Sequence, residues 1–252
     1  MIITLLTDYG PRDEFVGVCH GVIHNIDPDA RIVDVTHGIS RHDVRHGAIS
    51  LRNALPFLPV GVHVAVVDPQ VGTERRAIAV RCEDGRILVG PDNGVLSLAW
   101  ERAGGAAEAI DVTRSQHRLE PVSATFHGRD IFAPVAARLA AGADLRDAGQ
   151  PVDVDELVAL ELPEPLVADG AATAHVLLVD GYGNASLDLT HDHLMELGLS
   201  RDAELAERGA AVDRQRNLAL GVLVDEQLAG RDVGECPREP PPRVAACRPQ
   251  GR

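Results

Sequence analysis

Strand-like and helix-like segments alternate through the first two thirds of the chain, and this alternation restricts the fold more than any other feature. Apolar runs at residues 2–7 and 62–67 are typical of strands buried on both faces, and residues 32–36 are predicted to form a further strand. Between them, residues 15–26 and 43–55 repeat apolar side chains at helical spacing. The sequence therefore predicts an α/β fold whose N-terminal sheet is largely parallel. Further strands are predicted at 77–82 and 86–89, and a further helix at 130–141.

Prolines divide the chain into parts of unequal size. Pro151 and Pro165 lie in a stretch that interrupts the alternating pattern, so we expect an N-terminal α/β catalytic domain over residues 1–160. Short strand-like runs on either side of a Gly-rich turn predict a smaller, β-rich domain over residues 172–230. Residues 231–252 are rich in Arg and Pro and are expected to form a disordered tail.

Composition excludes several classes of protein. The formal net charge of −14 argues against a nucleic-acid partner, because such binding depends on clustered basic side chains. No apolar run reaches the about 18–20 residues that span a bilayer, and the first residues read as a strand rather than a signal peptide. The four cysteines suggest no disulfide framework or zinc site. We expect a soluble, cytoplasmic protein that acts on a small molecule.

Polar residues follow the predicted strands, where ligands of α/β sheets bind. Asp8 comes after the first strand, Asp68 begins a polar loop that includes Arg75, and His127 precedes the helix at 130–141. Asp8 alone could equally be a turn residue, and a single loop histidine is more often a surface residue than a catalyst. Three such groups at the ends of elements of one sheet indicate an active site.

Other enzyme classes lack their motifs. The chain has neither a Gly-rich phosphate loop nor the G-x-S-x-G sequence of serine hydrolases. The spacing of His20 with His24, and of His42 with His46, would allow a metal site on a helix face. Because neither pair belongs to an H-E-x-x-H sequence, an exposed helix face is the simpler interpretation. A metal-dependent hydrolase remains a separate hypothesis.

Six short motifs in register resemble the S-adenosyl-L-methionine (SAM) hydroxide adenosyltransferase family, whose relatives include bacterial fluorinating and chlorinating enzymes. They extend over roughly residues 1–195, and together they are far more specific than any one of them. The motifs are Leu5-Leu6-Thr7-Asp8-Tyr9-Gly10, Val33-Asp34-Val35-Thr36-His37, Val66-Val67-Asp68-Pro69 with Val71-Gly72-Thr73-Glu74-Arg75, Pro91-Asp92-Asn93-Gly94, Thr125-Phe126-His127-Gly128-Arg129-Asp130, and Asp180-Gly181-Tyr182-Gly183-Asn184.

The resemblance implies hydrolysis of SAM to adenosine and L-methionine by activated water, without a metal or a cofactor. Position by position, it makes Asp68, Arg75 and His127 the triad that prepares the water. It implies that Asp8 holds the ribose hydroxyls. Two further substrate-binding residues, Asp180 and Asn184, would come from the second domain. It also implies a homotrimer with the substrate at a subunit interface.

Two positions favour water over a halide as the nucleophile. The halogenating relatives tend to have Tyr where Asp68 stands, and a carboxylate would repel an anion. The fluorinating branch has Ser at the position of Gly128. One substitution is unusual within the family, since Gln70 stands where Gly is usual; if that position needs a positive φ, Gln would strain the loop.

The resemblance fades after about residue 195, where the family's usual Asn-Ser-x-Gly segment and later Asn-x-Gly-x-Ala stretch are missing. This difference leaves a second hypothesis from another class, namely a protein that binds adenosine or SAM with little or no turnover. The presence of Asp68, Arg75 and His127 favours the enzyme, because a protein that only binds has no need of all three.

Overall fold

The computed structural model describes residues 1–168, 171–196, 206–207 and 219–223. They form two units: one contains Met1–Pro163 and Val176–Asp188, and the other contains Glu164–His175 and the segment from Leu189 onward. The predicted division at residues 160 and 172 stays a prediction, and the expected tail at 231–252 lies outside the described residues. Within the described part, no helix is long and apolar enough to cross a membrane.

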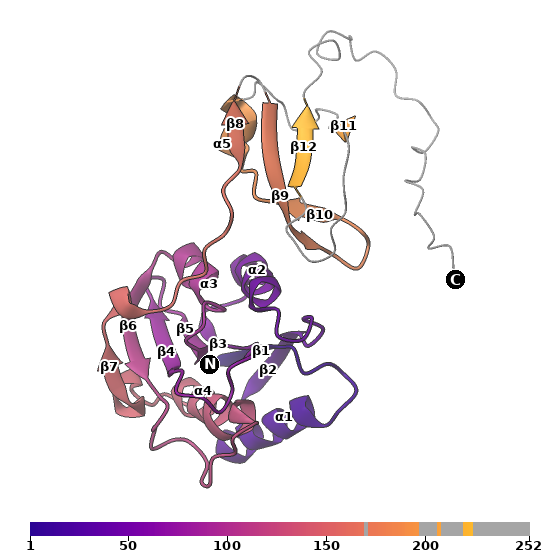
Figure 1. The fold of residues 1–252 in the computed structure, drawn as a ribbon. Helices are drawn as coiled ribbons and strands as arrows, with labels where there is room; N and C mark the ends of the chain where they lie inside the picture. Colours follow the sequence, from indigo (N-terminus) through magenta and orange to yellow (C-terminus); the bar gives the residue numbers. More distant parts are fainter. Residues whose placement is uncertain (169–170, 197–205, 208–218, 224–252) are drawn as a thin grey trace. The chain divides into compact units, whose positions relative to one another are not determined.

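A mixed seven-stranded sheet organises the first unit, in the order β2-β1-β3-β5-β4-β6-β7 (Figure 1). The four strands β2, β1, β3 and β5 are parallel to one another, whereas β4, β6 and β7 add to this group through antiparallel pairs. The predicted largely parallel α/β fold is confirmed. The strands are β1 (Ile2–Thr7), β2 (Arg31–Thr36), β3 (Gly61–Val66), β4 (Ala77–Cys82), β5 (Ile87–Pro91), β6 (Ala106–Asp111) and β7 (Gln150–Val152).

Helices cover both faces of this sheet, so the unit has three layers (Figure 1). Helices α1 (Phe15–Ile26) and α4 (Ala133–Ala140) pack on one face, and α2 (Val44–Ala54) and α3 (Ser97–Arg102) on the other. Alternate residues of β3 enter the two cores, with Val64 on the α1 and α4 side and Ala65 on the α2 and α3 side. Burial on both faces explains why β3 is apolar along most of its length.

The segment before α4 differs from its prediction. Instead of one α-helix over 130–141, residues Gly128–Phe132 form a π-helix that leads into α4. Asp130 does not cap its own helix; its Oδ2 accepts a hydrogen bond from the backbone N–H of Ser123, 2.8 Å away. This bond ties the loop before the helix to the helix itself. Single turns of π-helix are rare and occur often at functional sites.

The strands after residue 163 pair antiparallel. Strand β9 (Ala171–Val179) pairs with β8 (Leu166–Ala168), β10 (Ala185–Leu187) and β12 (Ala219–Leu223), and β11 (Ala206–Glu207) pairs with β12. A short helix, α5 (His191–Glu196), follows β10. The β-rich character expected for this region is present in its described residues.

Candidate active site

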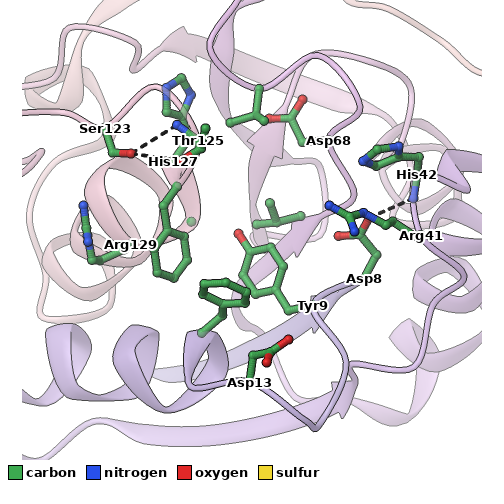
Figure 2. A pocket seen from close by; sticks show the side chains of 15 residues that line it. Asp8, Tyr9, Asp13, Arg41, His42, Asp68, Ser123, Thr125, His127 and Arg129 are labelled. Atoms are coloured by element: carbon green, nitrogen blue, oxygen red, sulfur yellow. Dashed lines mark hydrogen bonds between the residues drawn. The ribbon is translucent and has the colours of Figure 1, made fainter.

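A cavity of about 510 Å³ opens at the carboxyl ends of β1 and β3. The volume is typical of small-molecule sites, and the position is the one that α/β sheets use for ligands. Asp8, which follows β1, and Asp68, which follows β3, line it together with His127 (Figure 2). Three of the residues predicted from sequence therefore surround one cavity.

Arg75 joins Asp68 to His127. Its Nε donates to Oδ1 and Oδ2 of Asp68, at 3.0 and 2.9 Å, and its Nη2 forms a further short contact with Oδ2. The same Nη2 donates to Nδ1 of His127, at 2.8 Å. The side chains of Arg75 and Asp68 are only 4% and 5% exposed, so solvent screens their attraction little.

The loop from Asp68 to Arg75 holds this geometry without the strain that a positive φ at Gln70 would cause. The residue with a positive φ in this loop is Gly72 (+79°), and Gln70 does not have one. A Cβ at residue 72 would lie 2.2 Å from the carbonyl oxygen of Ala124, so only glycine fits there. Thr73 closes the turn, since its hydroxyl donates to the carbonyl of Gln70 at 2.8 Å.

The imidazole of His127 is neutral near pH 7. Burial lowers its pKa below the ordinary value and the Arg75 guanidinium lowers it further, whereas the Asp68 carboxylate opposes them. Because a guanidinium can only donate, Nδ1 of His127 must be the unprotonated nitrogen. The hydrogen of the neutral ring is therefore on Nε2.

Asp8 is held by a loop that sequence reasoning did not assign to the site. Its Oδ2 accepts a hydrogen bond of 2.8 Å from the backbone N–H of His42, whose φ is +65°. Arg41 and His42 both line the cavity and come from the loop after β2 (Figure 2). The position of this loop after a parallel strand was the available signal. A non-glycine residue with positive φ is uncommon, and such residues concentrate at active sites.

The metal hypothesis gains no support from the positions of its histidines. His42 precedes α2, so it does not share a helix face with His46 as the spacing suggested. His20 instead contacts Oδ1 of Asp34, at 2.9 Å. Within the residues described, no three His, Cys, Asp or Glu side chains are grouped so that they could hold a metal ion.

Asp180 and Asn184 lie in the turn between β9 and β10 and contact each other. Oδ1 of Asp180 accepts from the backbone N–H groups of Tyr182 and Asn184, both at 2.9 Å. Its Oδ2 accepts from the side-chain amide of Asn184, at 2.7 Å. These bonds stabilise the turn, and the substrate-binding role of the two residues stays a prediction.

Comparison with known proteins gives a consistent result. Residues 3–149 match the model of the SAM hydroxide adenosyltransferase N-terminal domain. An (R)-S-adenosyl-L-methionine hydrolase from Salinispora tropica is 55% identical over 188 residues, covering 73% of this chain and 70% of that protein. A protein of the same name from Salinispora arenicola is 49% identical over 233 residues, covering 90% and 87%.

A solved structure also matches. The crystal structure of an uncharacterized conserved protein from Thermotoga maritima aligns with a TM-score of 0.75 and 31% identity, covering 91% of this chain and 95% of that one. The chain therefore belongs to the SAM hydroxide adenosyltransferase family.

Proposed function

We propose that this protein hydrolyses SAM to adenosine and L-methionine; two of its relatives are named (R)-S-adenosyl-L-methionine hydrolases. The observation that carries the proposal is that one buried guanidinium, that of Arg75, joins Asp68 to His127, and both of these residues line the cavity. A protein that only bound SAM would gain little from a carboxylate and a neutral imidazole held in this way.

The chemistry requires an activated nucleophile and no acid. Water attacks C5′ of the substrate, the new C–O bond forms as the C5′–S bond breaks, and the bonding electrons leave with sulfur as the neutral thioether of methionine. The attacking water must lose one proton to a base. General-base assistance contributes about 10²–10⁴ in rate, and the placement of water in line with C5′ adds to it.

Within this proposal Asp68 is the base. Nδ1 of His127 already accepts from Arg75, so its lone pair is engaged. The carboxylate of Asp68 has two oxygens and retains acceptor capacity beyond its bonds to Arg75. Arg75 stabilises the negative charge that develops as water approaches C5′. His127 holds the guanidinium in place through its Nδ1.

Asp8 is proposed to bind the ribose hydroxyls through the oxygen that His42 does not occupy. Asp180 and Asn184 are proposed to contact the adenine or methionine portions. We further propose a cytoplasmic homotrimer, as the family resemblance implies, and no metal or cofactor in the reaction. The net charge of −14 suits a cationic substrate.

The test is incubation of the purified full chain with SAM and EDTA, followed by liquid chromatography of adenosine and methionine. We expect equal amounts of both from the wild type. Asp68→Asn, which keeps the shape of the side chain but not its basicity, should reduce the rate by at least about 10²-fold. Asp29→Asn, at an exposed turn, is the matched control.

Two results would contradict the proposal. Adenosine or SAM binding without any product would identify a binding protein and direct attention to the altered C-terminal sequence. Product that disappears when EDTA is added would identify a metal-dependent hydrolase.

A further inference from the structure

Tyr9 stands between the cavity and the core, with its ring held on two sides. The ring packs edge-on against Phe15 and Phe126, with centroids 5.9 and 5.7 Å away. Its backbone N–H donates to the hydroxyl of Thr7, at 3.2 Å. Figure 2 shows the phenol pointing away from its backbone into the cavity, toward the space below Asp68. The hydroxyl is therefore placed by packing around the ring.

Gly128 makes room for this hydroxyl. A Cβ on residue 128 would lie 2.1 Å from the Tyr9 hydroxyl oxygen, and 3.0 and 3.2 Å from the ring carbons Cζ and Cε2. Gly128 does not have a positive φ, so backbone conformation gives no reason for glycine at this position. The close approach of Tyr9 does give one. The two residues are complementary in shape although they lie far apart in the sequence.

The hydroxyl is a neutral group that still needs a partner. Burial raises the pKa of Tyr9 well above its ordinary value, and the nearby Cys19, Asp8 and Asp68 raise it further, so the phenol keeps its proton. Among the residues that the structure describes, none forms a hydrogen bond with this hydroxyl. Tyr9 is half-buried and lines the cavity, and a tyrosine whose ring is packed in the protein usually places its hydroxyl where it finds a hydrogen-bond partner. A ligand in the cavity would supply it.

We propose that the Tyr9 hydroxyl binds the attacking water and orients it with respect to Asp68, an inference that rests on the proposed hydrolysis. A water molecule held by Asp68 alone can rotate about that single hydrogen bond. A second bond, to Tyr9, fixes the direction of the oxygen lone pair that attacks C5′. Gly128 is the residue that permits this arrangement, because any side chain there would displace the phenol.

The first test is Tyr9→Phe, which removes the hydroxyl and keeps the ring. We expect kcat to fall about tenfold or more, with KM within about threefold of the wild type, because the lost bond acts on water and not on SAM. Thermal unfolding should be close to that of the wild type. An unchanged kcat, or a change confined to KM, would overturn the proposal. Absence of product from the wild type would instead refute the hydrolysis itself, and this proposal with it.

The second test is a double-mutant cycle that combines Gly128→Ala with Tyr9→Phe. In the wild-type background the added methyl meets the hydroxyl oxygen, so kcat should fall at least about as far as in Tyr9→Phe alone. In the Tyr9→Phe background the nearest atom is a ring carbon at 3.0 Å, and the same methyl should cost much less. Gly21→Ala is the matched control, because no atom lies within 4 Å of its added methyl. Equal losses of kcat in both backgrounds would refute the pairing of Tyr9 with Gly128.

Discussion

A buried histidine outside the active site should make this protein sensitive to mild acid. His63, on β3, has no exposed surface, and its Nδ1 lies 2.9 Å from the hydroxyl of Thr4. Its Nε2 is buried without a hydrogen-bond partner in the described structure. Burial, with the charge of Arg86 adding to it, lowers the pKa of His63 from 6.5 to about 4. A protonated imidazole would be an unpaired charge inside the core.

The size of the effect follows from proton linkage. Between pH 6.5 and pH 4 the unfolded chain binds a proton at His63 and the folded chain does not, so acid favours unfolding. The stabilisation is complete above pH 6.5 and is lost as the pH falls toward 4. Each pH unit between the two pKa values is worth about 1.4 kcal/mol. At pH 4.5 the loss of unfolding free energy attributable to His63 is therefore roughly 2.5 kcal/mol.

Urea denaturation at pH 7 and pH 4.5 measures this loss in the wild type and in His63→Asn. Asparagine places an amide near the position of Nδ1, so it can still bond to Thr4, and it does not titrate. We expect His63→Asn to be less stable at pH 7 but to lose roughly 2.5 kcal/mol less on acidification than the wild type. His24→Asn, at an exposed position of α1, is the matched control. The same loss in the wild type and in His63→Asn would refute the reasoning.

Three further outcomes are expected. Arg75→Lys keeps the charge, but one ammonium cannot bridge Asp68 and His127 as the guanidinium does, so kcat should fall at least about 10²-fold. A kcat within about tenfold of the wild type would contradict the bridging role. The pH profile of kcat/KM should decline on the acid side with a midpoint below 6.5, because the pKa of His127 is lowered and only its neutral ring accepts a hydrogen bond from Arg75. A midpoint above 6.5 would count against the role of the neutral His127 ring. Gly90→Ala should lower the free energy of unfolding by about 2 kcal/mol or more, because its Cβ would lie 2.4 Å from the carbonyl oxygen of Ala65 on the neighbouring strand. Thermal unfolding measures this loss of stability, and a melting temperature equal to that of Gly21→Ala would contradict the prediction.

The strands at the centre of the sheet were the most predictable part of the fold. Burial on both faces requires continuous apolar runs, and these were visible at β1 and β3 to within a residue. Strand β6 was missed because its sequence, Ala106–Asp111, is mostly alanine and acidic residues and becomes a strand through pairing with β4 and β7.

The triad was predictable and its surroundings were not. Its three residues, a carboxylate, a guanidinium and an imidazole, lie in motifs that can be recognised in the sequence. The fit of Tyr9 onto Gly128 depends on a contact between distant segments, which neither segment encodes alone. The left-handed backbone of His42 is similar, because its residue type alone does not predict this conformation. Local sequence patterns predict helices, strands and candidate functional residues. The contacts between loops depend on how the whole sheet assembles.

The two cores of the N-terminal unit provide separate spectroscopic reporters. The chain has one tryptophan, Trp100, and it is buried on the face covered by α2 and α3. The interlocked rings of Tyr9, Phe15 and Phe126 belong to the other face, beside the cavity. Indole fluorescence should therefore follow global unfolding and respond little to ligand, while the near-ultraviolet dichroism of tyrosine responds to occupancy. A single sample can in this way distinguish a variant that has lost its fold from one that has lost only the order of its active site.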